Sequence, residues 1–171
     1  MNSLVAGIII VLIVLIVLIV MYVLYIPMPT QDQLTAHTAK VLVITCMDFR
    51  LIDDAVYFLN GRGYNNNYDE IVLAGASLGY NQTKYECWKK TVDDHIGLAR
   101  KLHHIKEVIV IDHMDCGAYK LFYGKTKLAR KEEIELHREN FEKFEELITS
   151  TYPDLTVSCY LMDIDGKITN Y

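Results

Sequence analysis

The sequence lacks the features that mark several classes of protein. Its four cysteines are scattered and form no Cys-x-x-Cys pair, which excludes a disulfide scaffold and a dithiol redox site. No block of basic residues is present and the formal net charge is −5, which disfavours a nucleic-acid partner. Hydrophobic residues make up 51% of the 171, so the chain is not intrinsically disordered, and its length suits a single domain.

Charge is absent from residues 4–26, all of which are hydrophobic except Gly7. A helix of this length spans about 34 Å, enough to cross a hydrocarbon core of roughly 30 Å. A cleaved signal peptide is disfavoured, because the run is long, no basic stretch precedes it and no small-residue cleavage site follows. We therefore predict a single-pass transmembrane anchor at residues 1–26, with membrane contact through residues 4–26, and a stalk at residues 27–39.

Residues 40–171 alternate short apolar runs with helical patterns. The runs that predict strands are residues 41–45, 71–74, 108–111 and 157–162. The patterns that predict helices are residues 52–59, 83–104 and 130–150. This alternation indicates an α/β domain, a small and mostly parallel sheet flanked by helices, preceded by the one N-terminal transmembrane helix.

Two polar clusters follow two of the predicted strands directly. Cys46 comes after the strand at residues 41–45, and His113 and Cys116 come after the strand at residues 108–111. Ligands of open α/β sheets bind outside the carboxyl ends of the strands, so these three side chains converge if the two strands are neighbours. Two thiolates and one imidazole suit Zn²⁺ and leave one tetrahedral position open, as in a catalytic site.

Asp48 and Arg50 lie next to the first predicted ligand. Arg50 can hold the Asp48 carboxylate in a bidentate pair, which keeps that carboxylate ionised and oriented. Asp48 then either accepts a hydrogen bond from a zinc-bound hydroxide or takes the fourth zinc position itself. Because Zn²⁺ with two thiolates is formally neutral, its water is acidified less than on three neutral ligands. We therefore expect activity that rises above neutral pH.

The combination Cys-x-Asp-x-Arg and His-x-x-Cys-Gly, each after a hydrophobic strand, resembles the β-class carbonic anhydrases over residues 40–171. The resemblance implies that Cys46, His113 and Cys116 bind zinc and that Asp48 and Arg50 form a catalytic dyad. It implies hydration of carbon dioxide to bicarbonate by zinc-bound hydroxide. It also implies a homodimer whose contact lies near the active-site cleft.

The sequence departs from the β-class pattern in the segment at residues 74–79, which lacks the usual asparagine, and at Phe49 and Asp112. Asp112 is interpreted as supporting a ligand or forming a turn. Two alternatives to carbon dioxide hydration therefore stay open. One is a non-enzymatic, membrane-tethered scaffold that reuses the fold, and the other is hydrolysis of a similar molecule such as carbonyl sulfide. A cysteine phosphatase is disfavoured, because three residues separate Cys46 from Arg50 where a phosphate-cradling loop needs five.

The remaining chemistry-bearing residues receive structural interpretations. Cys87 and Cys159 are interpreted as small buried hydrophobic residues. Glu133 and His137, on the predicted helix at residues 130–150, are assigned to its solvated face. The cysteine chemistry favours a reducing, cytosolic side of the membrane for the domain at residues 40–171.

Overall fold

The computed structural model describes residues 3–24 and 37–171, which belong to two separate units. The first unit contains helix α1 (Ser3–Leu24). Among the residues whose side chains are described, no helix is both long and apolar enough to be a candidate membrane span. The first two and the last two residues of the predicted anchor, and residues 27–36 of the predicted stalk at residues 27–39, lie outside the described residues.

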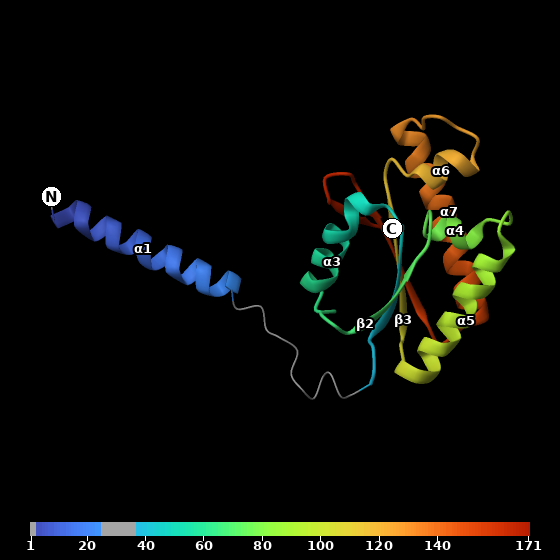
Figure 1. Cartoon of the computed structure of the whole chain (residues 1–171), viewed down its shortest axis with the longest axis horizontal. Helices are drawn as coiled ribbons and strands as arrows, with labels where there is room; N and C mark the ends of the chain where they lie inside the picture. Colours follow the sequence, from blue (N-terminus) through green and yellow to red (C-terminus); the bar gives the residue numbers. More distant parts are fainter. Residues whose placement is uncertain (1–2, 25–36) are drawn as a thin grey trace. The chain divides into compact units, whose positions relative to one another are not determined.

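The second unit is an alternation of strands and helices (Figure 1). Its strands are β1 (Val41–Thr45), β2 (Tyr68–Val72), β3 (Glu107–His113), β4 (Thr156–Met162) and β5 (Ile168–Asn170). Its helices are the 3₁₀ turn η1 (Phe49–Leu51), α3 (Ile52–Gly61), α4 (Ser77–Asn81), α5 (Glu86–His103), α6 (Gly117–Phe122) and α7 (Arg130–Thr151).

The strands form one sheet in the order β2-β1-β3-β4-β5. The first four strands are parallel, and only β5 runs antiparallel to its neighbour β4. β1 and β3 are central, and their continuous apolar sequences are buried as strands covered on both faces require. The predicted α/β domain with a small, mostly parallel sheet is confirmed.

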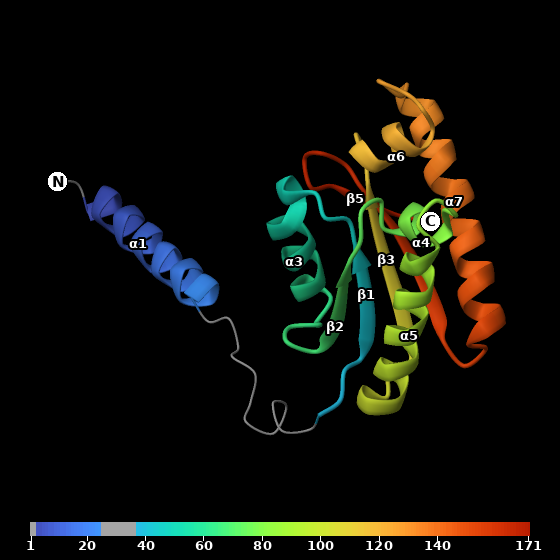
Figure 2. The ribbon, with the colours of Figure 1, turned by 45° about the vertical axis from the view of Figure 1, so that its right-hand side comes forward.

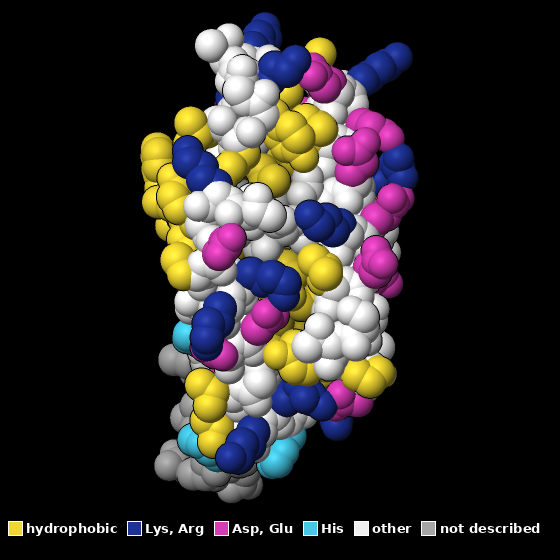
Figure 3. Space-filling view, turned by 90° about the vertical axis from the view of Figure 1, so that its right-hand side faces the viewer, with side chains coloured by type: hydrophobic (Ala, Val, Ile, Leu, Met, Phe, Trp, Pro, Cys, Tyr) yellow, Lys and Arg dark blue, Asp and Glu magenta, His cyan; other side chains and the backbone are white. Residues whose placement is uncertain are grey.

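Helices cover both faces of this sheet (Figure 2). α3 packs on one face against Val43, Ile109 and Tyr160, whereas α4, α5 and α7 pack on the other. The outer surface formed by α5 and α7 carries basic and acidic side chains interspersed (Figure 3). The central strands are thereby held rigidly, with their carboxyl ends at one edge of the sheet.

Some element boundaries differ from the sequence-based prediction. β2 lies at Tyr68–Val72 and not at residues 71–74, because this edge strand is only partly buried and does not need a continuous apolar run. The helix predicted from residue 83 begins at Glu86, because the Gln82 side chain accepts the Tyr85 N–H (2.8 Å) and holds a turn there. The short helices α4 and α6 were not predicted.

Candidate metal centre

The sheet register brings the three predicted ligands to one point. Cys46 is the first residue after β1, His113 is the last residue of β3, and β1 and β3 are parallel neighbours. Cys116 follows as the residue that precedes helix α6. The ligand atoms of the three side chains all lie within 4.8 Å of one another. The predicted convergence of these side chains is therefore present in the fold.

The donor atoms have the spacing and chemistry that a metal ion requires. The two sulfurs, Cys46 Sγ and Cys116 Sγ, are 3.9 Å apart. Two thiolates bound to one tetrahedral zinc at about 2.3 Å each would lie roughly 3.8 Å from one another. His113 Nδ1 lies 2.9 Å from the carbonyl oxygen of Met114, to which it donates in the tautomer that leaves Nε2 unprotonated. Nε2 is buried without a hydrogen-bond partner, so its lone pair is available to a metal.

The two thiols are not equivalent. The hydrogen bond that the Cys46 and Cys116 sulfurs share lowers the pKa of Cys46 far below its ordinary value, against the opposing effect of burial. The Gly75 N–H also donates to Cys46 Sγ (3.3 Å) and favours the thiolate. The same shared proton raises the pKa of Cys116. A metal ion held by both sulfurs would displace this proton.

The predicted Asp48–Arg50 pair is present and bidentate. Arg50 Nε donates to Asp48 Oδ1 (2.9 Å), and Arg50 Nη2 donates to Asp48 Oδ2 (2.7 Å). These hydrogen bonds lower the pKa of Asp48 to about 2. Asp48 Oδ2 lies 3.8 Å from His113 Nε2, which places an ionised carboxylate directly beside the three donor atoms.

Arg50 also joins the two sequence motifs. Its Nη1 donates to the carboxylate of Asp115 (3.0 Å), and its Nη2 donates to the Asp115 carbonyl oxygen (3.3 Å). Asp115 precedes Cys116 and has a left-handed backbone with φ of 60°. The guanidinium therefore fixes the backbone next to one ligand while it orients the carboxylate next to another.

Two cavities border the site. One, of about 140 Å³, is lined by Cys46, Asp48 and His113 and by apolar side chains that include Val56 and Val72. The other is a wider apolar groove of about 430 Å³ on the Cys116 side, which we call the Phe49 groove. Its lining includes Phe49, Trp88, Leu121 and Phe122. The first cavity therefore combines the polar groups of the site with a largely apolar lining.

Two residues that the sequence assigned to a solvated helix face belong to this region. Glu133 is buried, and its Oε1 accepts the N–H of Cys116 (3.0 Å). His137 is completely buried, and its Nδ1 lies 2.9 Å from Asp112 Oδ2. The signal was present in the spacing, because both residues fall on the stripe of α7 that also carries Phe141 and Phe144.

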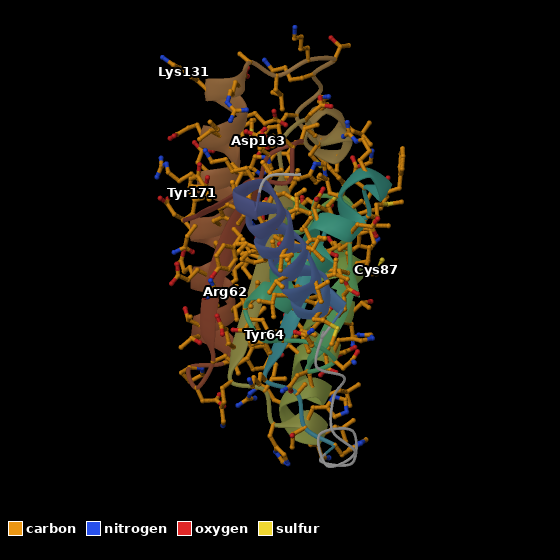
Figure 4. The ribbon with its side chains drawn as sticks, turned by 90° about the vertical axis from the view of Figure 1, so that its left-hand side faces the viewer. Arg62, Tyr64, Cys87, Lys131, Asp163 and Tyr171 are labelled. Atoms are coloured by element: carbon orange, nitrogen blue, oxygen red, sulfur yellow. The ribbon has the colours of Figure 1, made fainter. Side chains whose placement is uncertain are left out.

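The two cysteines outside the cluster differ in burial. Cys159 is buried within the core, as predicted. The prediction that Cys87 is buried is wrong. Cys87 is exposed on the first turn of α5, where it is labelled in Figure 4. Its neighbours Glu86 and Thr91 are exposed too, and the buried face of the helix is formed by Val92, Ile96 and Ala99.

Known proteins resemble this chain over most of its second unit. A family model described as "Putative carbonic anhydrase" matches residues 36–170. An uncharacterized protein of Rickettsia bellii (strain RML369-C) is 40% identical over 135 residues, which cover 78% of this chain and 82% of the relative. An uncharacterized protein of Rickettsia conorii (strain ATCC VR-613 / Malish 7) is 38% identical, with coverage of 78% and 73%.

Solved structures share the fold. The β-carbonic anhydrase CafA of Aspergillus fumigatus has a TM-score of 0.53 at 13% identity, covering 79% of this chain and 76% of CafA. Wild-type CafD of the same fungus has a TM-score of 0.53 at 12% identity, covering 86% of this chain and 92% of CafD. At such identities the likeness concerns the fold alone.

Proposed function

This chain belongs to the carbonic anhydrase family as a divergent member with the β-class fold, and from this premise we propose that it is a zinc lyase that hydrates carbon dioxide to bicarbonate. The observation that carries the proposal is the cluster of Cys46, His113 and Cys116, whose ligand atoms lie within 4.8 Å of one another. His113 Nε2 is buried there without a partner, which is costly unless an ion or a donor occupies the point at which it aims.

Each residue has a defined part in this proposal. Cys46, His113 and Cys116 would hold zinc, which when bound supplies an acidified water at neutral pH. Asp48, held ionised by Arg50, accepts a hydrogen bond from the attacking water and so orients it. The apolar walls of the 140 Å³ cavity suit carbon dioxide, which is small and uncharged.

The test is zinc content followed by stopped-flow hydration of carbon dioxide. Cys46→Ser is expected to lose both bound zinc and activity. Cys87→Ser is the matched control, because it makes the same substitution at an exposed cysteine away from the cluster, and it is expected to keep both. A zinc-loaded wild-type protein without turnover would contradict the proposal and favour the scaffold. Turnover of carbonyl sulfide but not carbon dioxide would favour the alternative substrate.

We further propose that the protein acts as a homodimer. The support is apolar surface beside the site, where the side chains of Phe49 and Leu121 are 82% and 66% exposed. Both residues line the Phe49 groove, which borders Cys46 and Cys116. A second copy of the chain seated there would bury this surface and close the site on that side.

Membrane attachment through α1 also remains a proposal. Its support is the uncharged sequence of residues 4–26 and the exposure of apolar side chains such as Ile10, Ile16 and Met21. The domain that follows would face a reducing compartment, because none of the four cysteines, all of them among the described residues, is paired in a disulfide. Resistance to extraction from membranes by alkaline carbonate would support the anchor, and release into the supernatant would contradict it.

A further inference from the structure

Two positions at which this chain departs from the β-class pattern are in direct contact. Ser77 begins α4 after the altered loop at residues 74–76, and Asp112 lies near the end of β3. The Ser77 N–H donates to Asp112 Oδ1 (2.9 Å), and the Ser77 hydroxyl donates to Asp112 Oδ2 (2.5 Å). Resting on the proposed zinc function, we propose that Ser77 and Asp112 form one positioning unit that holds the Cys46 sulfur in its metal-binding geometry.

This unit is built as a rigid, fully buried network. Asp112 is 1% exposed, and Ser77 and His137 are 0% exposed. Besides the two donors of Ser77, the Asp112 carboxylate faces the Tyr119 hydroxyl (2.6 Å) and His137 Nδ1 (2.9 Å). A buried carboxylate is stable only when its oxygens are satisfied. Three donors satisfy this one, and His137 adds a fourth in the tautomer whose Nδ1 carries the proton. Such a network permits a single arrangement of the groups that donate to it.

The loop transmits this arrangement to Cys46. Gly75 has φ of 78°, and its N–H donates to Cys46 Sγ (3.3 Å). Ala76 has φ of 39° and ψ of −98°, an unfavourable conformation for a residue with a Cβ, which persists only where the surroundings hold it. Ser77 is the residue after Ala76, and its two hydrogen bonds to Asp112 keep the backbone in this conformation. Losing them would free the loop to relax and withdraw the Gly75 N–H from the sulfur.

The same network reaches the other two predicted ligands. Asp112 directly precedes His113, so its anchored side chain fixes the end of β3. Tyr119 lies on α6, whose first residue follows Cys116. His137 lies one turn after Glu133 on α7, and Glu133 accepts the Cys116 N–H. The Ser77–Asp112 unit is therefore the point at which the supports of all three ligands meet.

Ser77 acts through position and not through contact with substrate. It is completely buried, and it is not among the described residues that line either cavity beside the site. Its hydroxyl is committed to Asp112 and lies 3.2 Å from the Tyr119 hydroxyl. Removing it should alter the metal centre itself, before any effect on turnover.

The test measures the metal centre of the full chain in detergent. Ser77→Ala is expected to weaken zinc binding tenfold or more in competition with a chromophoric chelator, as for other residues that support metal ligands. It is also expected to shift the thiolate-to-metal absorption of the Co²⁺-substituted protein. Ser158→Ala is the matched control, because the Ser158 hydroxyl donates to Glu107 over the same 2.5 Å, at the opposite end of β3. Its zinc affinity and Co²⁺ spectrum should match the wild type.

The outcomes separate this inference from the function on which it rests. If Ser77→Ala and Ser158→Ala bind zinc equally and give the same Co²⁺ spectrum, the positioning unit is overturned while the zinc function stands. If the wild type binds no zinc, both are overturned. Should Ser77→Ala fail to fold, Tyr119→Phe removes one donor to Asp112 with little change in volume. Severalfold weaker zinc binding and a shifted Co²⁺ spectrum in Tyr119→Phe would support the unit, and wild-type values would overturn it.

Discussion

The guanidinium of Arg50 binds both carboxylate oxygens of Asp48, at 2.9 Å and 2.7 Å. Arg50→Lys replaces this planar fork with a single point charge, which cannot satisfy both oxygens. Losing a charge-assisted hydrogen bond costs about 1.5–3 kcal/mol, so we expect kcat/KM for carbon dioxide hydration to fall roughly tenfold or more. Zinc content should fall less than activity does, because all three predicted ligands remain and Arg50 reaches them only through its hydrogen bonds to Asp115 beside Cys116.

The control for Arg50→Lys is Arg138→Lys. Arg138 pairs with Glu135 and Glu142 on the exposed face of α7, away from the site. It should leave kcat/KM unchanged. Equal activity of Arg50→Lys and the wild type would show that the bidentate geometry is not needed for the reaction.

The pH dependence of activity follows from the charges at the site. The pKa of Asp48 is about 2, so this carboxylate stays ionised throughout the working range. A depressed carboxylate pKa means that the ion pair is intact at neutral pH and weakens only as the pH falls below about 4. The activity change near neutrality must then come from the water, which two thiolates make less acidic. We expect kcat to rise between pH 6 and 9 in a stopped-flow profile, and a flat profile would contradict this explanation.

A residue of the site could be predicted where the local sequence pattern around it indicates its position in the fold. β1 and β3 are buried on both faces, so their apolar runs were visible, and the residues that follow them could be expected to meet at one edge. His137 was assigned to solvent because a histidine in a charged helix resembles an exposed residue. Its spacing does place it on the buried stripe of α7 with Phe141 and Phe144, but its partner Asp112 lies 25 positions away and could not be identified from the sequence.

The altered loop could not be interpreted from the sequence for the same reason. Ser77 is a common residue, and its importance comes from the carboxylate of Asp112, which belongs to another strand. Contacts between residues far apart in the chain carry no local pattern. The edge strand β2 was misplaced because Asp69 and Glu70 interrupt its apolar run.

The four cysteines should differ in reactivity toward iodoacetamide. In the zinc-loaded protein we expect only Cys87 to react quickly, because it is the one cysteine of the four whose side chain is exposed at the surface. Cys159 should react only on unfolding, since burial raises its pKa to about 12 and keeps it protonated. After zinc removal by a chelator, Cys46 should become reactive, because its lowered pKa favours the thiolate. Peptide mass spectrometry measures each site, and equal alkylation of Cys46 with and without zinc would contradict its role as a ligand.

The proposed dimer can be tested at Phe49. Phe49→Glu places a charge in the Phe49 groove, and burying that charge would prevent a second copy from docking. We expect light scattering of the full chain in detergent to show half the wild-type protein mass. Leu98→Glu is the control, because Leu98 is also exposed, at 52%, but lies on α5 outside the groove lining. A wild-type mass for Phe49→Glu would place the contact elsewhere.

The contribution of Glu133 to stability can be tested by substitution, with its exposed neighbour Glu132 as the control. Glu133→Ala removes the acceptor of the buried Cys116 N–H and leaves that donor without a partner. An unsatisfied buried group costs about 1–3 kcal/mol, so the free energy of unfolding in urea should fall by that amount. Glu132→Ala changes an exposed residue that forms a surface ion pair with Lys125, and it should cost less than about 1 kcal/mol. Because the Cys116 N–H lies at the start of α6, Glu133→Ala should also weaken zinc binding. Equal effects of the two substitutions on stability and on zinc binding would show that Glu133 behaves as a solvent-exposed residue.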